Sequence, residues 1–381
     1  MKKNYIAASV LLVFSVPALA QSSVTLYGLI DEGLTFTNNA KGHQAYQMQS
    51  GYLAGSRWGL KGAEDLGGGY KATFQIENGF DVNTGGLGQG GLGFGRQAYV
   101  GLVNDQFGGV TLGRQYDSLV DYLAQTTVTG SWGGYIFAHP YDNDNATNTF
   151  RVNNTVKYTS PTFAGLKFGG TYSFSNDTNF ANNRQYSVGA QYTLGGLLLA
   201  ASYLHANNPS ATATGAINNG GDENFVAQRL QIFGAGVNYN FGAATLGFVY
   251  TNTYIAQPVS SGYVGPITPA TGTLSSLRFQ NFEINGRYQF TPAFSLGAVY
   301  TYTRTNFDTT AGKSHPNYQQ GGLMVDYLLS KRTDVYLQAA YQHAGGDKNG
   351  SVLDVAYVPG AAAVSSNSNQ VVVRGAIMHK F

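Results

Sequence analysis

VVVRGAIMHKF, residues 371–381, changes character at every second position. One series of residues runs back from Phe381 and is mostly apolar, while the other series carries both charges, Arg374 and Lys380. Alternation with a period of two over about ten residues is typical of a β-strand whose two faces meet unlike environments. What the apolar face contacts must be inferred from the rest of the chain.

The composition favours a large sheet. The 381 residues include 51 Gly, 27 Tyr and 22 Phe, only 11% of them are charged, and none is Cys. A chain of this size without disulfides must be held by an extensive sheet or core. Beyond its start, the chain has no run of apolar residues long enough for a transmembrane helix. Many alternating strands, as in a transmembrane β-barrel, would combine modest hydropathy with so many aromatic residues.

Residues 1–20, MKKNYIAASVLLVFSVPALA, have the pattern of a secretory signal. Lys2 and Lys3 precede a short apolar stretch, and Ala18-Leu19-Ala20 forms a small-residue cleavage site before Gln21. The apolar run is too short to cross about 30 Å of hydrocarbon as a helix. Without the two lysines, the 22 basic and 20 acidic residues become 20 and 20, so no net charge favours nucleic acid as a partner. We expect 21–381 to form one domain.

Seven short turns rich in Gly, Pro, Asn or Asp separate alternating segments, and each predicts a hairpin. Seven hairpins contain fourteen strands, and the first and last segments raise the predicted number to sixteen. Longer polar stretches separate the hairpins. An even number of strands, with short connections at one end and long connections at the other, is typical of outer-membrane barrels. The predicted turns are 64–69, 104–109, 160–165, 193–196, 240–243, 290–293 and 329–333.

The faces of the predicted strands agree with a membrane barrel. In NFEINGRYQF (281–290), Phe282 and Ile284 alternate with Glu283 and Asn285. One face could meet lipid and the other water. A soluble β-sandwich would also alternate, but it would rarely need sixteen strands of ten or more residues. We therefore expect an all-β, 16-stranded antiparallel transmembrane β-barrel.

Several stretches resemble the trimeric general porins of Gram-negative outer membranes, most closely those of beta-proteobacteria. The resemblance is dense in the N-terminal half and rests on pattern and the last strand in the C-terminal half. The resemblance implies an integral outer-membrane homotrimer that is surrounded by lipid and lipopolysaccharide. It also implies that the outer-membrane assembly machinery reads Phe381 as its signal. The resembling stretches are SSVTLYGLIDEG (22–33), SRWGLKGAEDLGGGYKATFQIENGF (56–80), GRQAYVGLVNDQFGGVTLGRQYD (95–117), NTVKYTSPTFAGLKFGGTYSF (154–174) and HKF (379–381).

The long connection 116–150 predicts a functional loop, because loops of this length in a compact architecture are usually functional. The resemblance implies that it is a third loop folded into the lumen, where its acids face a row of wall arginines. Opposed charged rows would filter ions by sign. The middle of the loop lacks the Pro-Glu-Phe segment of enterobacterial porins. The implied wall residues are Arg57, Arg96 and Arg151, the implied loop acids are Asp117 and Asp121, and further candidate lumen residues are Glu77, Asp142 and Asp144.

The alternation of side chains along each strand is a second, independent reason to place these arginines on the water-facing side. In SRWGLKG (56–62), Arg57 lies on the face opposite Trp58 and Leu60, and in GRQAYVG (95–101), Arg96 lies opposite Tyr99. Since Trp and Tyr mark the lipid side, both arginines are predicted to face water. Gly28, Trp58, Leu60 and Tyr99 would then be available outside for contact between barrels.

Three functions are compatible with a barrel. The first is a passive channel for small hydrophilic solutes and ions, which needs no cofactor. The second is a substrate-specific channel, and the third, an outer-membrane hydrolase, lacks a recognisable nucleophile and base. The six histidines have no zinc-ligand spacing, and GLGQGG (86–91) lacks the following helix that phosphate binding requires. In a substrate-specific channel, stacking platforms would come from Tyr116, Tyr122, Trp132, Tyr135 and Tyr141.

Overall fold

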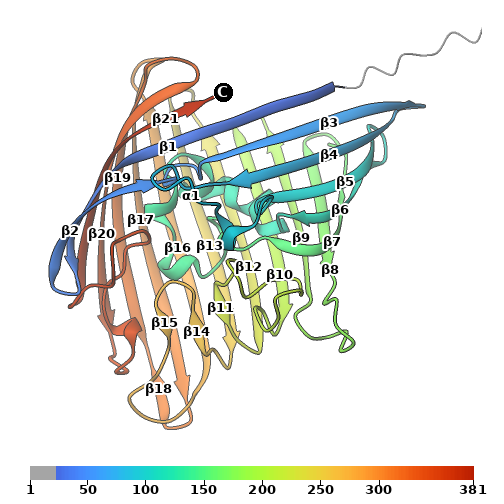
Figure 1. Ribbon diagram of the computed structural model, residues 1–381. Coiled ribbons are helices and arrows are strands. Elements are labelled where there is room, and N and C mark those ends of the chain that lie inside the picture. The colour runs from blue at the N-terminus through green and yellow to red at the C-terminus, as the bar shows by residue number, and fades with distance from the viewer. Residues whose placement is uncertain (1–22) are drawn as a thin grey trace, which may run out of the picture.

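A computed structural model describes residues 23–381 as an antiparallel sheet closed into a barrel (Figure 1). The predicted signal peptide, 1–20, lies outside the described residues. The sheet has 18 strand segments. However, β2 (His43–Ser50) and β3 (Arg57–Gly67) run along the same edge of β1 (Ser23–Ala40), and β18 (Gly312–Ser314) and β19 (Pro316–Leu328) run along the same edge of β17 (Phe294–Thr309). Two strands are therefore interrupted, and the barrel has 16 strands, as predicted.

The strands follow one another around the barrel in chain order. The first half comprises β1 (Ser23–Ala40), β2 (His43–Ser50), β3 (Arg57–Gly67), β4 (Tyr70–Gly79), β5 (Gln97–Asn104), β6 (Gly108–Gln115), β7 (Val152–Thr159), β8 (Leu166–Ser173) and β9 (Gln185–Leu194). The second half comprises β10 (Leu197–Asn207), β12 (Arg229–Asn240), β13 (Ala244–Ala256), β16 (Leu274–Gln289), β17 (Phe294–Thr309), β18 (Gly312–Ser314), β19 (Pro316–Leu328), β20 (Thr333–Gly346) and β21 (Asn369–Lys380).

The remaining elements lie in the connections. A separate three-stranded sheet is formed by β11 (Phe225–Val226), β14 (Ser260–Ser261) and β15 (Gly265–Pro266). The helical turns are η1 (Gln89–Gly91), η2 (Leu119–Leu123), η3 (Ala124–Thr126), α1 (Val128–Ser131), η4 (Tyr135–Phe137), η5 (Pro140–Asp142) and η6 (Val352–Asp354). Within 23–381, no helix is long and apolar enough to cross a membrane.

All seven predicted turns are confirmed, because each joins two neighbouring antiparallel strands. The opposite end of the barrel was expected to carry only long connections, but it carries both long and short ones. At that end most connections are long loops, but two are tight turns, at 41–42 and 310–311, which follow the extended strands β1 and β17. The short-turn end corresponds to the periplasmic end of an outer-membrane barrel.

The outer face is apolar and the inner face is polar, as the alternation predicts. On β16, Ile284 is 61% exposed, whereas the neighbouring Glu283 is fully buried. On β21, Ile377 points outward and Arg374 points inward, where its guanidinium pairs with Asp31 at 3.2 Å. An apolar outer face and hydrogen-bonded backbone are what hydrocarbon requires of a spanning sheet.

The predicted outward position of Tyr99 is wrong. Its hydroxyl donates to Gln75 on the inner face at 2.9 Å, and it is Val100 that is exposed outside. The error arose because Arg96 precedes β5 and does not share the alternation of the strand.

The seam between the first and last strands closes the barrel. β1 pairs with β21 from Leu29–Lys380 to Thr37–Val372, and Phe381 extends the ladder by exchanging backbone hydrogen bonds with Gly28 at 3.0 and 3.2 Å. The Phe381 ring lies over Gly28, where any Cβ would overlap it. The terminal aromatic therefore covers the last step of the seam.

Deleting Phe381 should lower the amount of folded, heat-modifiable barrel in the outer membrane several-fold, because the seam loses two backbone hydrogen bonds and an apolar cover. The measurement is quantitative gel-shift analysis of outer-membrane fractions. Phe107→Ala is a matched control, since Phe107 is 64% exposed in a turn away from the seam. Wild-type amounts of the deletion variant would show that closure does not depend on this residue.

Candidate functional site

Three arginines line one cavity inside the barrel. Arg57 begins β3, Arg96 directly precedes β5, and Arg151 directly precedes β7. All three contribute to the wall of a cavity of about 870 Å³. β3, β5 and β7 are alternate strands of the sheet, separated by β4 and β6, and all three start at the same end of the barrel. The structure thus brings the three predicted arginines to one cavity, and their role in a constriction stays a prediction.

The three arginines differ in their partners. Arg96 Nε donates to Glu77 at 2.7 Å, and Glu77 also accepts hydrogen bonds from the hydroxyls of Tyr27 and Tyr116 at 2.8 and 3.1 Å. Arg57 and Arg151 instead donate to backbone carbonyls at 2.7 and 3.2 Å. Within 23–381, neither guanidinium has a carboxylate within 4 Å, although the backbone N–H of Arg151 donates to Asp222 at 3.1 Å. Neither guanidinium is therefore paired directly with an acid.

A fourth wall arginine, Arg114, was not predicted from the sequence. It makes a bidentate ion pair with Asp222, with distances of 2.7 and 2.8 Å. Simple alternation from Leu112 would put Arg114 outside the barrel. Gly113, however, has a φ of 134°, and the pairing with β7 shifts register immediately after it. This irregularity turns Arg114 inward.

Two of the predicted constriction acids hold the loop together instead of facing the arginines. Asp117 is fully buried; one carboxylate oxygen accepts the backbone N–H of Leu119 at 2.7 Å, and the other accepts the amide of Asn145 at 2.7 Å. Burial raises the pKa of Asp117 to about 6. Asp142 is equally buried and accepts hydrogen bonds from Thr149. The prediction that these two acids line the water path is wrong.

Asp121 lies in a different cavity from the three arginines. It pairs with Lys157 in a cavity of about 250 Å³ that Lys167 and Tyr99 also line. Lys157 in addition donates to the backbone carbonyl of Tyr116 at 3.1 Å. This predicted acid is therefore neutralised by a lysine of the wall.

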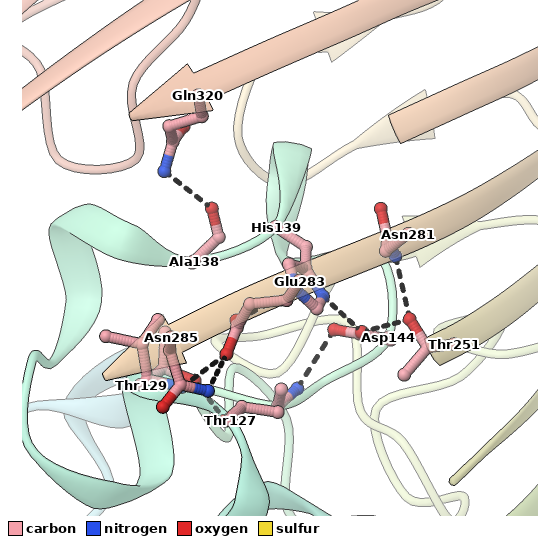
Figure 2. A network of polar contacts seen from close by, with 12 residues as sticks. Thr127, Thr129, Ala138, His139, Asp144, Thr251, Asn281, Glu283, Asn285 and Gln320 are labelled. Carbon is pink, nitrogen blue, oxygen red and sulfur yellow. Dashed lines mark hydrogen bonds and ion pairs between the residues drawn. The ribbon is translucent and has the colours of Figure 1, made fainter. Parts of the chain in front are cut away.

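Asp144 belongs to a buried ionic network that anchors the loop to the wall (Figure 2). His139 Nδ1 lies 2.6 Å from Asp144, and His139 Nε2 lies 3.1 Å from Glu283 of β16. Glu283 also accepts the backbone N–H of Val128 at 2.8 Å, and Thr251 donates to Asp144 at 2.6 Å. The prediction of a lumen-lining role for Asp144 is wrong, and sequence reasoning gave His139 no role.

The network requires a protonated His139. Both ring nitrogens face carboxylate oxygens, which only accept hydrogen bonds, so both must carry a proton. Burial alone would lower the pKa of His139, but Asp144 and Glu283 outweigh burial and raise it to about 10. The three side chains therefore form a carboxylate–imidazolium–carboxylate latch between the loop and β16.

The loop also packs against glycines on the inner face of the wall. A Cβ on Gly297 of β17 would overlap Trp132, and a Cβ on Gly322 of β19 would overlap Phe137. On β12, a Cβ on Gly234 would lie 2.6 Å from Leu123. These inward positions provide the space in which the loop side chains pack.

The aromatic platform predicted for a substrate-specific channel is not supported. Tyr141 is 1% exposed and packs in the core between loop and wall, and Tyr122, which is 3% exposed, lines the smaller cavity that contains Asp121. Tyr135 is stacked with Tyr263. Tyr116, Trp132 and Tyr135 contribute to the cavity of the three arginines, whereas Tyr122 and Tyr141 do not, so the five rings do not form one platform. Among residues 23–381, no three His, Cys, Asp or Glu side chains are grouped as a metal site would need.

Comparison with known proteins gives a consistent result. A sequence model described as Gram-negative porin matches residues 7–347. An outer membrane porin protein of Bordetella pertussis is 31% identical over 370 residues, which cover 90% of this chain and 94% of that protein. Outer membrane porin protein 32 of Delftia acidovorans is 31% identical over 269 residues, with coverages of 68% and 72%.

Solved structures show the same fold. An anion-selective porin from Comamonas acidovorans superposes with a TM-score of 0.69 at 23% identity, and the match covers 95% of this chain and all of that chain. The family match spans most of the sequence, and the Bordetella relative aligns over nearly its whole length. The chain therefore belongs to the Gram-negative porin family and is an integral channel protein of the outer membrane.

Proposed function

We propose that the protein is a passive-diffusion porin whose narrowest region favours anions. The observation that carries this proposal is the charge of the cavity lining. Six basic side chains and only two acidic ones contribute to it: Arg57, Arg96, Arg151, Arg287, Lys331 and Lys380 against Asp326 and Asp334.

The loop supports this selectivity by leaving the arginines unopposed. Its residues at the cavity, such as Val120, Ala124, Gln125 and Thr129, are uncharged. Its acids accept hydrogen bonds within the loop or form ion pairs with Lys157 and His139. We propose that the loop narrows the water path beside the arginines, so that a one-sided positive field concentrates anions there. The fold neighbour from Comamonas acidovorans, described as anion-selective, is consistent with this proposal.

Changing Arg57, Arg96 and Arg151 together to Gln should lower the chloride-to-potassium permeability ratio on the order of tenfold, because three positive charges leave the cavity and Glu77 loses its partner. The measurement is the zero-current potential of the purified protein in planar bilayers under a potassium chloride gradient. The difference should shrink in concentrated salt, because the screening length is about 10 Å at 0.1 M.

Arg304→Gln is the matched control, because this arginine is exposed on the outer face of β17 and should leave ion selectivity unchanged. If the triple variant keeps the wild-type potential at low salt, the proposed anion filter does not lie at these arginines. Linear conductance with salt would support passive diffusion, whereas saturation by one solute would contradict it.

The latch of His139, Asp144 and Glu283 should make the loop sensitive to pH. We expect His139→Gln to increase open-channel current noise, because it leaves Asp144 and Glu283 without their cation; breaking a buried pair costs about 3–5 kcal/mol. The folded-state pKa of about 10 is above the ordinary value of 6.5, so this stabilisation is complete below pH 6.5 and is lost as the pH rises through 10. Wild-type noise should therefore rise between pH 6.5 and about 10.

Current noise that rises equally with pH in wild type and in His139→Gln would contradict the latch. The comparison between the two proteins removes the contribution of tyrosines and lysines, which titrate near pH ~10 in both. A Tyr46→Phe variant is a suitable neutral control, because Tyr46 is 76% exposed on the outer face of β2, away from the loop.

We further propose a homotrimer. The family resemblance supports it, and the fold neighbour OmpT of Vibrio cholerae, at a TM-score of 0.63, is described in a trimer form. On β1 and β3, Gly28 and Leu60 share the outer parity of Trp58, which is 39% exposed, and so could pack between barrels. Lipid, lipopolysaccharide and the assembly machinery are its expected partners. The protein is expected to lack catalytic activity.

In mild detergent, the native mass should equal three chains. Trp58→Arg should shift the population toward monomers, because it puts a charge into an apolar contact, whereas Phe233→Arg on the distant β12 should not. A wild-type mass of a single barrel would rule out the trimer.

A further inference from the structure

A group of basic side chains lies on the outer face of the barrel, toward the end with the long loops. Arg229 begins β12, Arg278 lies near the start of β16, and Arg304 lies near the end of β17. Each shares the outward parity of exposed aromatic residues on its own strand, namely Phe233, Phe282 and Tyr300. The lumen and its proposed anion filter are on the other side of the wall.

Two of these guanidinium groups converge on one aromatic ring. The Arg229 and Arg278 guanidinium carbons lie 5.5 and 5.1 Å from the ring centroid of Tyr254. Tyr254 is on β13, which runs between β12 and β16, and it is directly paired with Arg278. The ring face attracts each cation but does not neutralise it. Two positive charges are therefore held together on the lipid-facing side.

The converging arginines have no acid to neutralise them. Within 23–381, Arg229, Arg278 and Arg304 have no carboxylate within 4 Å, and their side chains make no hydrogen bond. Arg229 Nε is shielded from solvent without an acceptor. The nearby outward acid Asp308 pairs with Lys313 at 3.6 Å. Like charges with free donors at one spot indicate an anionic ligand that supplies the missing acceptors.

The height of this group matches that of lipid head groups. On β16, the exposed apolar residues end at Phe282, and Arg278 follows four residues farther toward the long-loop end. Four residues of strand span about 13 Å, or about 10 Å along the membrane normal at a tilt of about 40°. The guanidinium groups therefore lie above the hydrocarbon, in the outer leaflet.

We propose that Arg229 and Arg278, held on Tyr254, form a binding site for the phosphate of an outer-leaflet lipid head group, with Arg304 beside it. A planar guanidinium can donate two parallel hydrogen bonds to phosphate oxygens. The proposed ligand is therefore a phosphorylated glycolipid of the outer leaflet, which carries phosphate on its sugar. The site rests on the outer-membrane location of the protein and is independent of the anion preference of the channel.

The test is native mass spectrometry of the delipidated full-length protein in detergent, titrated with diphosphorylated lipid A and with the same lipid after enzymatic removal of its phosphates. Wild type should bind the phosphorylated lipid roughly tenfold more tightly. Arg229→Gln/Arg278→Gln should lose this preference and keep its heat-modifiable band and its channel conductance. Arg57→Gln, which removes a lumen arginine, should keep the preference.

Three outcomes would overturn the site. Equal affinity for the two lipids, or wild-type affinity in the double variant, would mean that these arginines do not bind the lipid phosphate. Full competition by inorganic phosphate at the concentration of the lipid would mean that the site takes a free anion and not a lipid. Because the readout is lipid binding, failure of the site leaves the ion selectivity of the channel untouched.

Discussion

The architecture depends on one constraint, which is that a sheet in hydrocarbon cannot leave its edge unpaired. Each unsatisfied backbone group costs several kcal/mol where no water can replace the missing partner. The ladder between β1 and β21 removes the only two edges that sixteen consecutive strands would leave. Once that seam forms, every spanning strand has neighbours on both sides, and side chains have only two environments, lipid or lumen.

Closure also concentrates polar groups inside the barrel, where they must satisfy one another. Arg374 illustrates the result, because it pairs with Asp31 while both side chains are fully buried, and it also stacks on Tyr52 at 4.6 Å. The loop 116–150, which contacts wall residues such as Glu283, carries its own acids, and most of them are bonded within the loop or to the wall. The latch of His139, Asp144 and Glu283 is one such anchor. The positive character of the cavity thus follows from how the loop is fastened.

Sequence alone could predict the features that depend on local patterns. The turns follow from Gly, Pro and Asn positions, and the faces of β16 and β21 follow from alternation, so strand number and orientation were accessible. Alternation failed where the backbone departs from a regular strand. Arg96 stands just before its strand, and Arg114 follows Gly113 at a shift of register. A pattern with a period of two contains no information about such irregularities.

The loop contacts were less accessible, because they join residues that are distant in the chain. Nothing near His139 in sequence indicates that Glu283, 144 residues away, supplies its second partner. Nor does a lone Gly297 or Gly322 show that an aromatic ring from the loop will occupy its side-chain space. An acid in a loop has the same sequence signature whether it faces water or caps a turn, so the sequence alone could not assign partners to Asp117, Asp142 and Asp144.

Arginine side chains meet different environments on the inner and outer faces of the barrel wall. Inside, Arg57 and Arg151 donate to backbone carbonyls and line the cavity, and within 23–381 no carboxylate pairs with either guanidinium. Outside, Arg229 and Arg278 stand at the margin of the lipid, where an unpaired cation is costly unless an anion joins it. A wall one residue thick can therefore act on solutes through one face and on lipid through the other. Which face a given arginine serves is decided by strand parity and by the local irregularities that interrupt it.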